Sequence, residues 1–310
     1  MVKNIALITG GTGYLGRNLT RNLLDSGWEV NLLVRDLSVT KLYSSYLEGA
    51  RTYFYDDDLN GLIKILDATR PTVVFHLAAK VVSDHKFDNI NDIYKSNILF
   101  GSQLLEAMRI CNLKKIVNTG SFWQYYDGDE YNPVSLYAAS KQAFEAILKY
   151  YAYAENFEVI TLTLFDNYGP DDTRPKLFPM LNRSALSKEL VKMSAGEQYI
   201  DIVYIDDVVE AYKSAALILL SGVDLDYKNY AVSSFEPIKL RDLVEIYLEL
   251  TPLKPNILWG ARPYRNREVM HPWSTGARLP GWRPKIGLRE GMEKIVPHLN
   301  SQVKFKHSDK

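Results

Sequence analysis

The chain has 310 residues, 46% hydrophobic and 24% charged, enough for one large core or two modest ones. Its 37 Lys and Arg balance 37 Asp and Glu, so net charge gives no argument for binding nucleic acid or an anionic membrane. The single cysteine, Cys111, excludes an internal disulfide and fits the reducing cytoplasm, where we expect the protein to act.

Short apolar strands alternate with helical patterns over the first half of the chain. The predicted strands are residues 5–9, 30–34, 51–55, 72–77, 115–120 and 159–165, with helical patterns near 14–26, 60–69 and 89–111. The strands lack strict alternation of polar and apolar residues, which is typical of parallel strands buried on both faces. The sequence therefore predicts an α/β fold with a doubly wound parallel sheet of the Rossmann type.

A glycine-rich turn, ITGGTGYLGRNL, joins the first strand to the first helix and fits both G-x-x-G-x-x-G and G-x-G-x-x-G. Positions without a side chain let backbone N–H groups approach a pyrophosphate at the positive end of a helix. The strand–turn–helix context favours dinucleotide binding over a merely tight turn. The residues expected to contact the dinucleotide are Gly10, Thr12, Gly13, Tyr14, Leu15 and Gly16.

The end of the second predicted strand should distinguish NAD from NADP. An acid there binds the adenosine ribose of NAD, whereas an arginine suits the 2′-phosphate of NADP. The stretch LLVRD has Val34 where the acid often falls, followed by Arg35. Arg35 therefore favours NADP (NADPH). The alternative is that Arg35 is solvated and Asp36 binds the ribose of NAD.

A phenol and an ammonium lie four residues apart in SLYAASKQAF, at Tyr137 and Lys141. Residues at this spacing are neighbours on a helix. The ammonium is expected to lower the pKa of the phenol from its usual value of about 10. A tyrosine tuned in this way can exchange a proton with a carbonyl or alcohol oxygen. Chance also produces this spacing, so the pair gains its meaning from the glycine turn upstream.

With these motifs the chain resembles the extended short-chain dehydrogenase/reductase superfamily from residue 1 to about residue 298. The resemblance implies that Tyr137 is the catalytic acid and that Lys141 tunes it and binds the nicotinamide ribose. It also implies that Ser121, in NTGSFW, bonds the reacting oxygen. Further dinucleotide contacts are implied for Asp58, Leu59, Leu77, Ala78, Ala79, Lys80, Asn97 and Thr119. For Asn97 the alternative is a bond to its own helix backbone.

The residues present disfavour two reactions of this superfamily. Dehydratases have an Asp–Glu pair directly after the serine, where this chain has Phe122 and Trp123. The epimerase-reductases acting at C3 and C5 use a cysteine and a histidine, but Cys111 precedes the fifth strand and no histidine lies between His85 and His271. Hydride transfer at one carbon remains, with a tyrosine handling the proton.

The second half, including LFDNYGPDD and AGEQYIDIVYIDDVVEAY, resembles the nucleotide-sugar branch, and within it the CDP-abequose synthase-like 4-ketoreductases. The resemblance implies NADPH-dependent reduction of the 4-keto group of a nucleotide-linked 4-keto-6-deoxy or 3,6-dideoxy hexose. CDP is the favoured nucleotide, and deoxysugar, O-antigen and lipopolysaccharide biosynthesis the expected setting. Substrate contacts are expected for Ser121, Phe122, Asn167, Lys176, Phe178 and Arg262, the last clamping the diphosphate.

The chain departs from the family pattern at two positions, and two other functions remain possible. Many relatives have an arginine where this chain has Ile200, and an asparagine where it has Asp166, whose carboxylate would repel a diphosphate unless it faces elsewhere. A 4-epimerase with tightly held NAD would use the same three catalytic residues. A non-catalytic dinucleotide-sensing protein is the third possibility.

The sequence also predicts how the chain is divided into domains and what it binds. We expect residues 1–165 to form the NAD(P)-binding domain, with 202–235 returning to it, and residues 166–201 and 236–300 to form a substrate-binding lobe. Residues 301–310 are expected to be a mobile tail. The resemblance implies a homodimer, because in relatives the helix of Tyr137 joins another helix to form a dimer interface, and here this helix is apolar on more than one face. The alternative is that the extra apolar face packs within the monomer. No metal site is expected, because the histidines lack ligand spacing.

Overall fold

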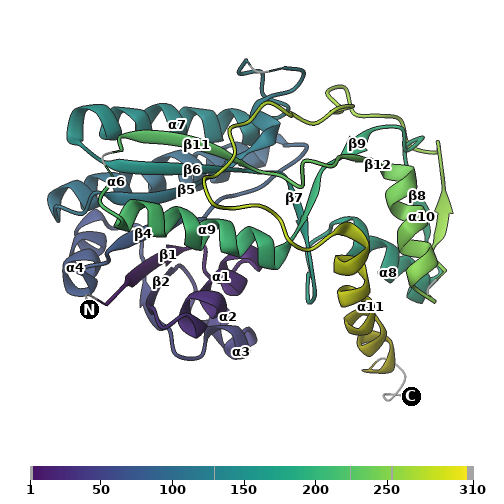
Figure 1. Cartoon of the computed structure of the whole chain (residues 1–310), viewed down its shortest axis with the longest axis horizontal. Coiled ribbons are helices and arrows are strands. Elements are labelled where there is room, and N and C mark those ends of the chain that lie inside the picture. The colour runs from purple at the N-terminus through teal and green to yellow at the C-terminus, as the bar shows by residue number, and fades with distance from the viewer. Residues whose placement is uncertain (1–2, 129, 224, 253, 306–310) are drawn as a thin grey trace.

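A seven-stranded parallel sheet lies at the centre of the computed structural model, which describes residues 3–128, 130–223, 225–252 and 254–305 (Figure 1). Its order is β11-β6-β5-β4-β1-β2-β3. The strands are β1 (Ile5–Thr9), β2 (Glu29–Val34), β3 (Arg51–Phe54), β4 (Val73–His76), β5 (Lys115–Ser121), β6 (Glu158–Leu164) and β11 (Tyr227–Val232). The chain winds outward in both directions from β1 and β4, which confirms the doubly wound α/β prediction.

Helices cover both faces of the sheet (Figure 1). On one face α1 (Tyr14–Asp25) packs against α9 (Ile205–Leu220); on the other lie α4 (Leu59–Thr69), α6 (Phe100–Ile110) and α7 (Leu136–Glu155). Two short helices, α2 (Ser38–Leu42) and α3 (Ser44–Leu47), follow β2. Each face has its own buried apolar cluster, one including Leu19 and Val208 and the other Leu62 and Leu148. Burial on both faces explains why the strands do not alternate in sequence.

The helix expected over residues 89–111 is broken into pieces. A 3-10 turn, η1 (Phe87–Asn89), precedes α5 (Ile90–Tyr94), and a π-helical segment, η2 (Lys95–Leu99), leads into α6. Asn97 in η2 is buried, and its side chain accepts from the Lys80 N–H (2.7 Å) and donates to the Lys80 carbonyl (3.1 Å) and the Ser140 hydroxyl (2.9 Å). The alternative that Asn97 bonds its own helix backbone is therefore wrong. The π segment turns this amide towards the loop after β4.

The second half of the chain builds the irregular lobe on the right of Figure 1. Its short strand pairs are β7 (Asp166–Tyr168) with β10 (Ile202–Tyr204), β8 (Leu190–Lys192) with β13 (Asn256–Leu258), and β9 (Tyr199–Ile200) with β12 (Ile238–Lys239). Its helices are α8 (Leu177–Ser187), α10 (Leu240–Leu250) and α11 (Leu288–Phe305). β11 returns to the main sheet beside β6. The exact domain boundaries stay a prediction.

The expected C-terminal tail is partly helical. Residues 301–305 of the expected tail belong to α11, whereas residues 306–310 lie outside the described residues. Among the helices of the described ranges, none has the length and apolar character needed to cross a bilayer.

Leu62 tests the packing of α4 because its side chain is fully buried. We expect Leu62→Ala to lower the free energy of unfolding by about 2–5 kcal/mol through lost contacts and a cavity. The matched control, Leu42→Ala, should stay within about 0.5 kcal/mol of wild type, because Leu42 is 77% exposed. Urea titrations followed by circular dichroism measure both, and equal stabilities would contradict the packing described.

Candidate active site

The glycine turn is shaped by close backbone approaches. Gly10 has φ +73°, and a Cβ there would lie 2.8 Å from the Ala78 nitrogen, while a Cβ on Gly16 would collide with the Gly10 carbonyl oxygen. Gly13 is the N-cap of α1 and has no side chain to bond the N–H groups of the first turn. Free N–H groups at a helix N-terminus and a backbone cradle without side chains fit a pyrophosphate.

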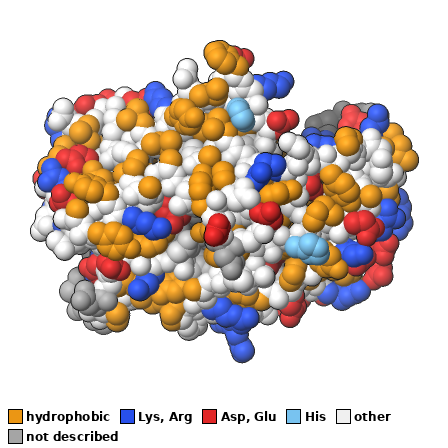
Figure 2. Space-filling model, turned by 90° about the horizontal axis from the view of Figure 1, so that it is seen from above, with side chains coloured by type: hydrophobic (Ala, Val, Ile, Leu, Met, Phe, Trp, Pro, Cys, Tyr) orange, Lys and Arg blue, Asp and Glu red, His pale blue; other side chains and the backbone are white. Residues whose placement is uncertain are grey.

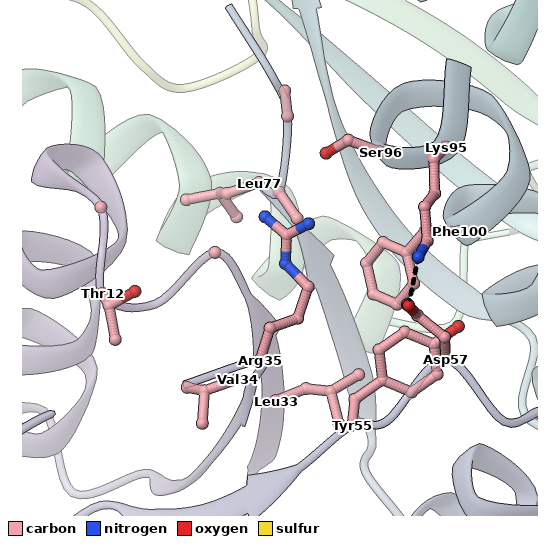
Figure 3. A pocket seen from close by; sticks show the side chains of 14 residues that line it. Thr12, Leu33, Val34, Arg35, Tyr55, Asp57, Leu77, Lys95, Ser96 and Phe100 are labelled. Atoms are coloured by element: carbon pink, nitrogen blue, oxygen red, sulfur yellow. Dashed lines mark ion pairs between the residues drawn. The ribbon is translucent and has the colours of Figure 1, made fainter. Parts of the chain in front are cut away.

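A cavity of about 250 Å³ opens beside this turn, at the carboxyl ends of β1, β2 and β4 (Figure 3). This is the switch point of the sheet, where ligands of doubly wound folds bind. Seven predicted dinucleotide contacts line it: Gly10, Thr12, Gly13, Arg35, Leu77, Ala78 and Ala79. The cavity therefore fits the adenosine end of a dinucleotide.

Arg35 is the cation at the end of β2. Its side chain projects into the cavity, with Thr12 on one side and Phe100 on the other (Figure 3). The carboxylate of Asp36 instead accepts hydrogen bonds from the hydroxyl (2.6 Å) and backbone N–H (2.8 Å) of Ser38, which lower its pKa. The position that selects between cofactors thus presents a guanidinium, while the neighbouring acid is engaged in its own turn.

Asp57 lines the cavity, whereas Asp58, the predicted dinucleotide contact, is not among the residues that line it. The carboxylate of Asp58 caps α4, accepting from the N–H groups of Asn60 (3.2 Å) and Gly61 (2.9 Å). An aspartate directly before a helical pattern is a common N-cap, so the sequence contained this signal. Leu59, the next predicted contact, is the first residue of α4 and half-buried.

Lys95 and the rings of Tyr55 and Phe100 also line the cavity, although they were not predicted from the sequence. The Lys95 ammonium pairs with Asp57 at 2.5 Å (Figure 3), and the two rings pack with their centroids 4.9 Å apart. Asp57 has φ +68°, a left-handed conformation that turns its side chain out of the line of β3. No sequence motif marks these four residues as one group.

Other predicted dinucleotide contacts are engaged elsewhere in the structure. The Thr119 hydroxyl donates to the His76 carbonyl (2.9 Å) and accepts from the Tyr212 hydroxyl (2.7 Å), tying β5 to β4 and α9. Tyr14 is buried, and the guanidinium groups of Arg17 and Arg174 lie 5.0 and 4.3 Å from the centre of its ring. Exposed Lys80 faces Asp92 at 3.6 Å, and Leu15 is half-buried in α1.

Ser121, Tyr137 and Lys141 come together where β5 ends and α7 begins. Ser135 caps α7, accepting from the Ala138 N–H at 3.3 Å, and so fixes Tyr137 in the first turn. Tyr137 is 8% exposed and Lys141 3%. The Ser121 hydroxyl is near enough to the Tyr137 phenol to favour its charged form and so to lower its pKa. The three side chains predicted to be catalytic thus share one buried site.

The expectation that Lys141 lowers the pKa of Tyr137 is wrong for this structure. Burial raises the pKa of Tyr137 to about 12, and the Ser121 hydroxyl offsets only part of the rise. Burial also lowers the pKa of Lys141 to about 8, although Glu145 opposes that fall. The reason is that removing either charged form from water costs more than the local interactions return.

Aromatic rings fill the places where dehydratases have their acids. Phe122 is stacked on Phe165, with centroids 4.9 Å apart and planes 5° from parallel. Trp123 lies edge-on to Tyr137 at 6.4 Å. These positions therefore provide an apolar wall beside Tyr137 and no second acid–base pair.

Asp166 does not repel an anion, because it faces a cation. Its carboxylate pairs with the Lys176 ammonium at 2.7 Å. The side-chain oxygen of Asn167, next in β7, accepts from the Arg174 guanidinium at 2.8 Å. Both predicted substrate contacts, Asn167 and Lys176, thus lie close together at the border of the second lobe.

Phe178 and Arg262 lie in contrasting surroundings. Phe178 packs in the core, with the rings of Tyr168 and Tyr247 each 5.3 Å away. Arg262 is exposed, and its backbone N–H donates to the Met193 carbonyl at 3.1 Å. Phe178 is therefore a packing residue, and a diphosphate contact of Arg262 stays a prediction. Within the described ranges, no three His, Cys, Asp or Glu side chains are grouped so that they could hold a metal.

Comparison with known proteins agrees with this geometry. A CDP-abequose synthase of Yersinia pseudotuberculosis is 29% identical over 271 residues, covering 86% of this chain and 90% of the relative. A second one, from Salmonella typhimurium, is 28% identical and covers 96% and 99%. The solved UDP-glucose 4-epimerase of Thermus thermophilus in complex with NAD is 26% identical, with a TM-score of 0.79 and coverage of 96% and 99%. Residues 6–219 match the family described as "NAD dependent epimerase/dehydratase family". The chain belongs to that family.

Proposed function

We propose that the protein uses NADPH to reduce the 4-keto group of a nucleotide-linked 4-keto-6-deoxy or 3,6-dideoxy hexose. The observation that supports this most directly is the buried Tyr137, with Ser121 beside it and Lys141 one turn later on α7. Similarity to CDP-abequose synthases over most of the chain favours a CDP-linked sugar and a place in deoxysugar or O-antigen synthesis.

The protein's own residues would handle the oxygen and the proton. When bound, the dinucleotide supplies the hydride for the carbonyl carbon. Tyr137 gives its proton to the carbonyl oxygen as charge develops there, and Ser121 donates a hydrogen bond to the same oxygen. A pKa of about 12 keeps the phenol protonated at neutral pH, as a proton donor must be. Lys141, one turn further along α7, would bind the ribose of the dinucleotide.

A 4-epimerase is the second candidate, supported by the similarity to the Thermus thermophilus enzyme, whose structure contains NAD. That reaction begins with removal of a proton from a sugar alcohol, so it needs a base. The three buried side chains would serve either reaction, so they do not separate the two candidates. Arg35 favours NADPH over NAD, and with it the reductase, because Asp36 is turned to Ser38. A dinucleotide sensor without catalysis would make no use of the three buried side chains.

The reductase proposal is tested by NADPH oxidation with CDP-, dTDP-, GDP- and UDP-linked 4-keto-6-deoxy hexoses. We expect turnover with one nucleotide class, and a loss of about a hundredfold or more in Tyr137→Phe, which lacks the acid. Tyr151→Phe is the matched control, because Tyr151 is on the same helix and its hydroxyl bonds Glu106 at 2.9 Å. Absence of turnover, with NAD retained through purification and sugar epimerised, would favour the second candidate.

Arg35 tests the choice of cofactor. We expect Arg35→Asp to raise the KM for NADPH about tenfold or more and to lower that for NADH, because a carboxylate repels the 2′-phosphate and accepts from the ribose. Arg51→Asp is the control, since Arg51 is exposed on neighbouring β3 and pairs with Glu29. An unchanged NADPH to NADH ratio in Arg35→Asp would mean that Arg35 does not contact the cofactor.

We further propose a homodimer through α6 and α7. Ile110, Tyr150 and Tyr153 expose 50%, 59% and 62% of their surface on these helices. Figure 2 views the molecule from the side of α7 and shows hydrophobic side chains among charges of both signs.

The dimer is tested by sedimentation equilibrium, which should give twice the mass of one chain. Tyr150→Glu with Tyr153→Glu should give a monomer, and Leu190→Glu, in the other lobe, should not. A cytoplasmic location stays a prediction.

A further inference from the structure

Four residues of α7 form a stripe at intervals of one turn: Tyr137, Lys141, Glu145 and Lys149. Glu145, which sequence analysis did not single out, is only 3% exposed. The Lys149 ammonium lies 3.2 Å from its carboxylate and is itself 38% exposed. A carboxylate this deeply buried is costly unless it is paired and hydrogen-bonded, so its surroundings should show what holds it.

Gln124 joins Glu145 to the backbone of Ser121. Its side chain is fully buried; the amide nitrogen donates to the Glu145 carboxylate (2.9 Å), and the amide oxygen accepts from the Ser121 N–H (2.9 Å). The amide nitrogen also donates to the side-chain oxygen of Gln142 at 2.6 Å. Both ends of the amide are therefore engaged, and the backbone that positions the Ser121 hydroxyl is tied to Glu145 through a single side chain.

The charges around Lys141 come from two elements. Glu145 on α7 favours the ammonium, opposing the burial that lowers the pKa of Lys141 to about 8. His76 on β4 also faces Lys141, but burial and that ammonium lower its pKa to about 3, so it is neutral at physiological pH. Of these two neighbours, Glu145 is the one that favours the charged form of Lys141.

Glu145 itself is faced by Lys149 from its own helix and by two phenols from other elements. Tyr125 follows η3 (Phe122–Gln124) and Tyr227 begins β11; burial raises the pKa of each phenol, and the Glu145 charge adds to the rise. Both phenols are neutral at physiological pH, so Lys149 is the cation that offsets Glu145 from the solvent side.

We propose that Glu145 is a positioning residue of the candidate active site. It acts directly on Lys141 and, through Gln124, on Ser121. Its charge, one helical turn from Lys141, keeps that side chain an ammonium. Its hydrogen bond to Gln124 holds the Ser121 backbone in place. The catalytic consequence rests on the proposed reductase function, but both contacts can be tested without it.

Glu145→Gln removes the charge and keeps an oxygen that can accept from Gln124. Lys141 should then lose its proton at lower pH, so the alkaline fall of kcat/KM for NADPH should move down by about one pH unit. Glu145→Asp keeps the charge and should leave that fall where wild type has it, with a lower kcat because the shorter side chain reaches Gln124 less well. Glu155→Gln, about 15 Å further along the same helix, should change neither quantity.

A second measurement separates this proposal from the proposed function. NADPH affinity is followed by fluorescence titration across the same pH range, without any sugar. If wild type oxidises no NADPH, but Glu145→Gln still moves the pH at which affinity falls, the reductase proposal fails and the role of Glu145 stands. A folded Glu145→Gln variant whose affinity falls at the wild-type pH would overturn that role.

If the Glu145→Gln variant does not fold, Gln124→Leu tests the proposed role of Glu145. It cuts the link to Ser121 and leaves the charge beside Lys141. We expect a NADPH affinity profile like that of wild type, together with a lower kcat in a protein that does catalyse. A shifted affinity profile, or an unchanged kcat, would contradict the two separate roles given to Glu145 and Gln124.

Discussion

Burial of a phenol and an ammonium on one face of α7 is the constraint on which the candidate active site depends. Water cannot solvate Tyr137 or Lys141 well, so their protonation is governed by a few neighbours. Ser121 acts on the phenol and Glu145 on the ammonium. The parallel pairing of β5 with β6, which ends at Ser121, positions the first of these neighbours. The cap that starts α7 fixes the helix that carries the second, Glu145.

The sheet brings this pair and the dinucleotide cavity to the same edge. β1 leads into the glycine turn, β2 into Arg35 and β4 into Leu77, while β5 ends at Ser121. Parallel strands place all these ends on one side, and the reversal of winding between β1 and β4 leaves room there. A ligand long enough to reach from Arg35 towards Ser121 therefore meets residues from strands that are far apart in the sequence.

Much of this could be predicted where local patterns decide the outcome. Strands buried on both faces, the glycine spacing and the Tyr137–Lys141 interval are readable from the chain. Asp57 and Lys95 could not be found, because a left-handed residue and a π-helical segment turn them into the cavity. The direction of the Tyr137 pKa was also missed, since it depends on burial by residues distant in sequence.

The place of β11 has a consequence for how the chain can be divided. β11 completes the hydrogen bonding of β6, and α9 shields one face of the sheet, yet both follow Asn167 and Lys176 in the chain. A fragment ending at Phe165 would expose an unpaired strand edge and apolar surface, the features that promote aggregation. Ribosomal synthesis must therefore deliver most of the polypeptide before the dinucleotide-binding half can finish folding.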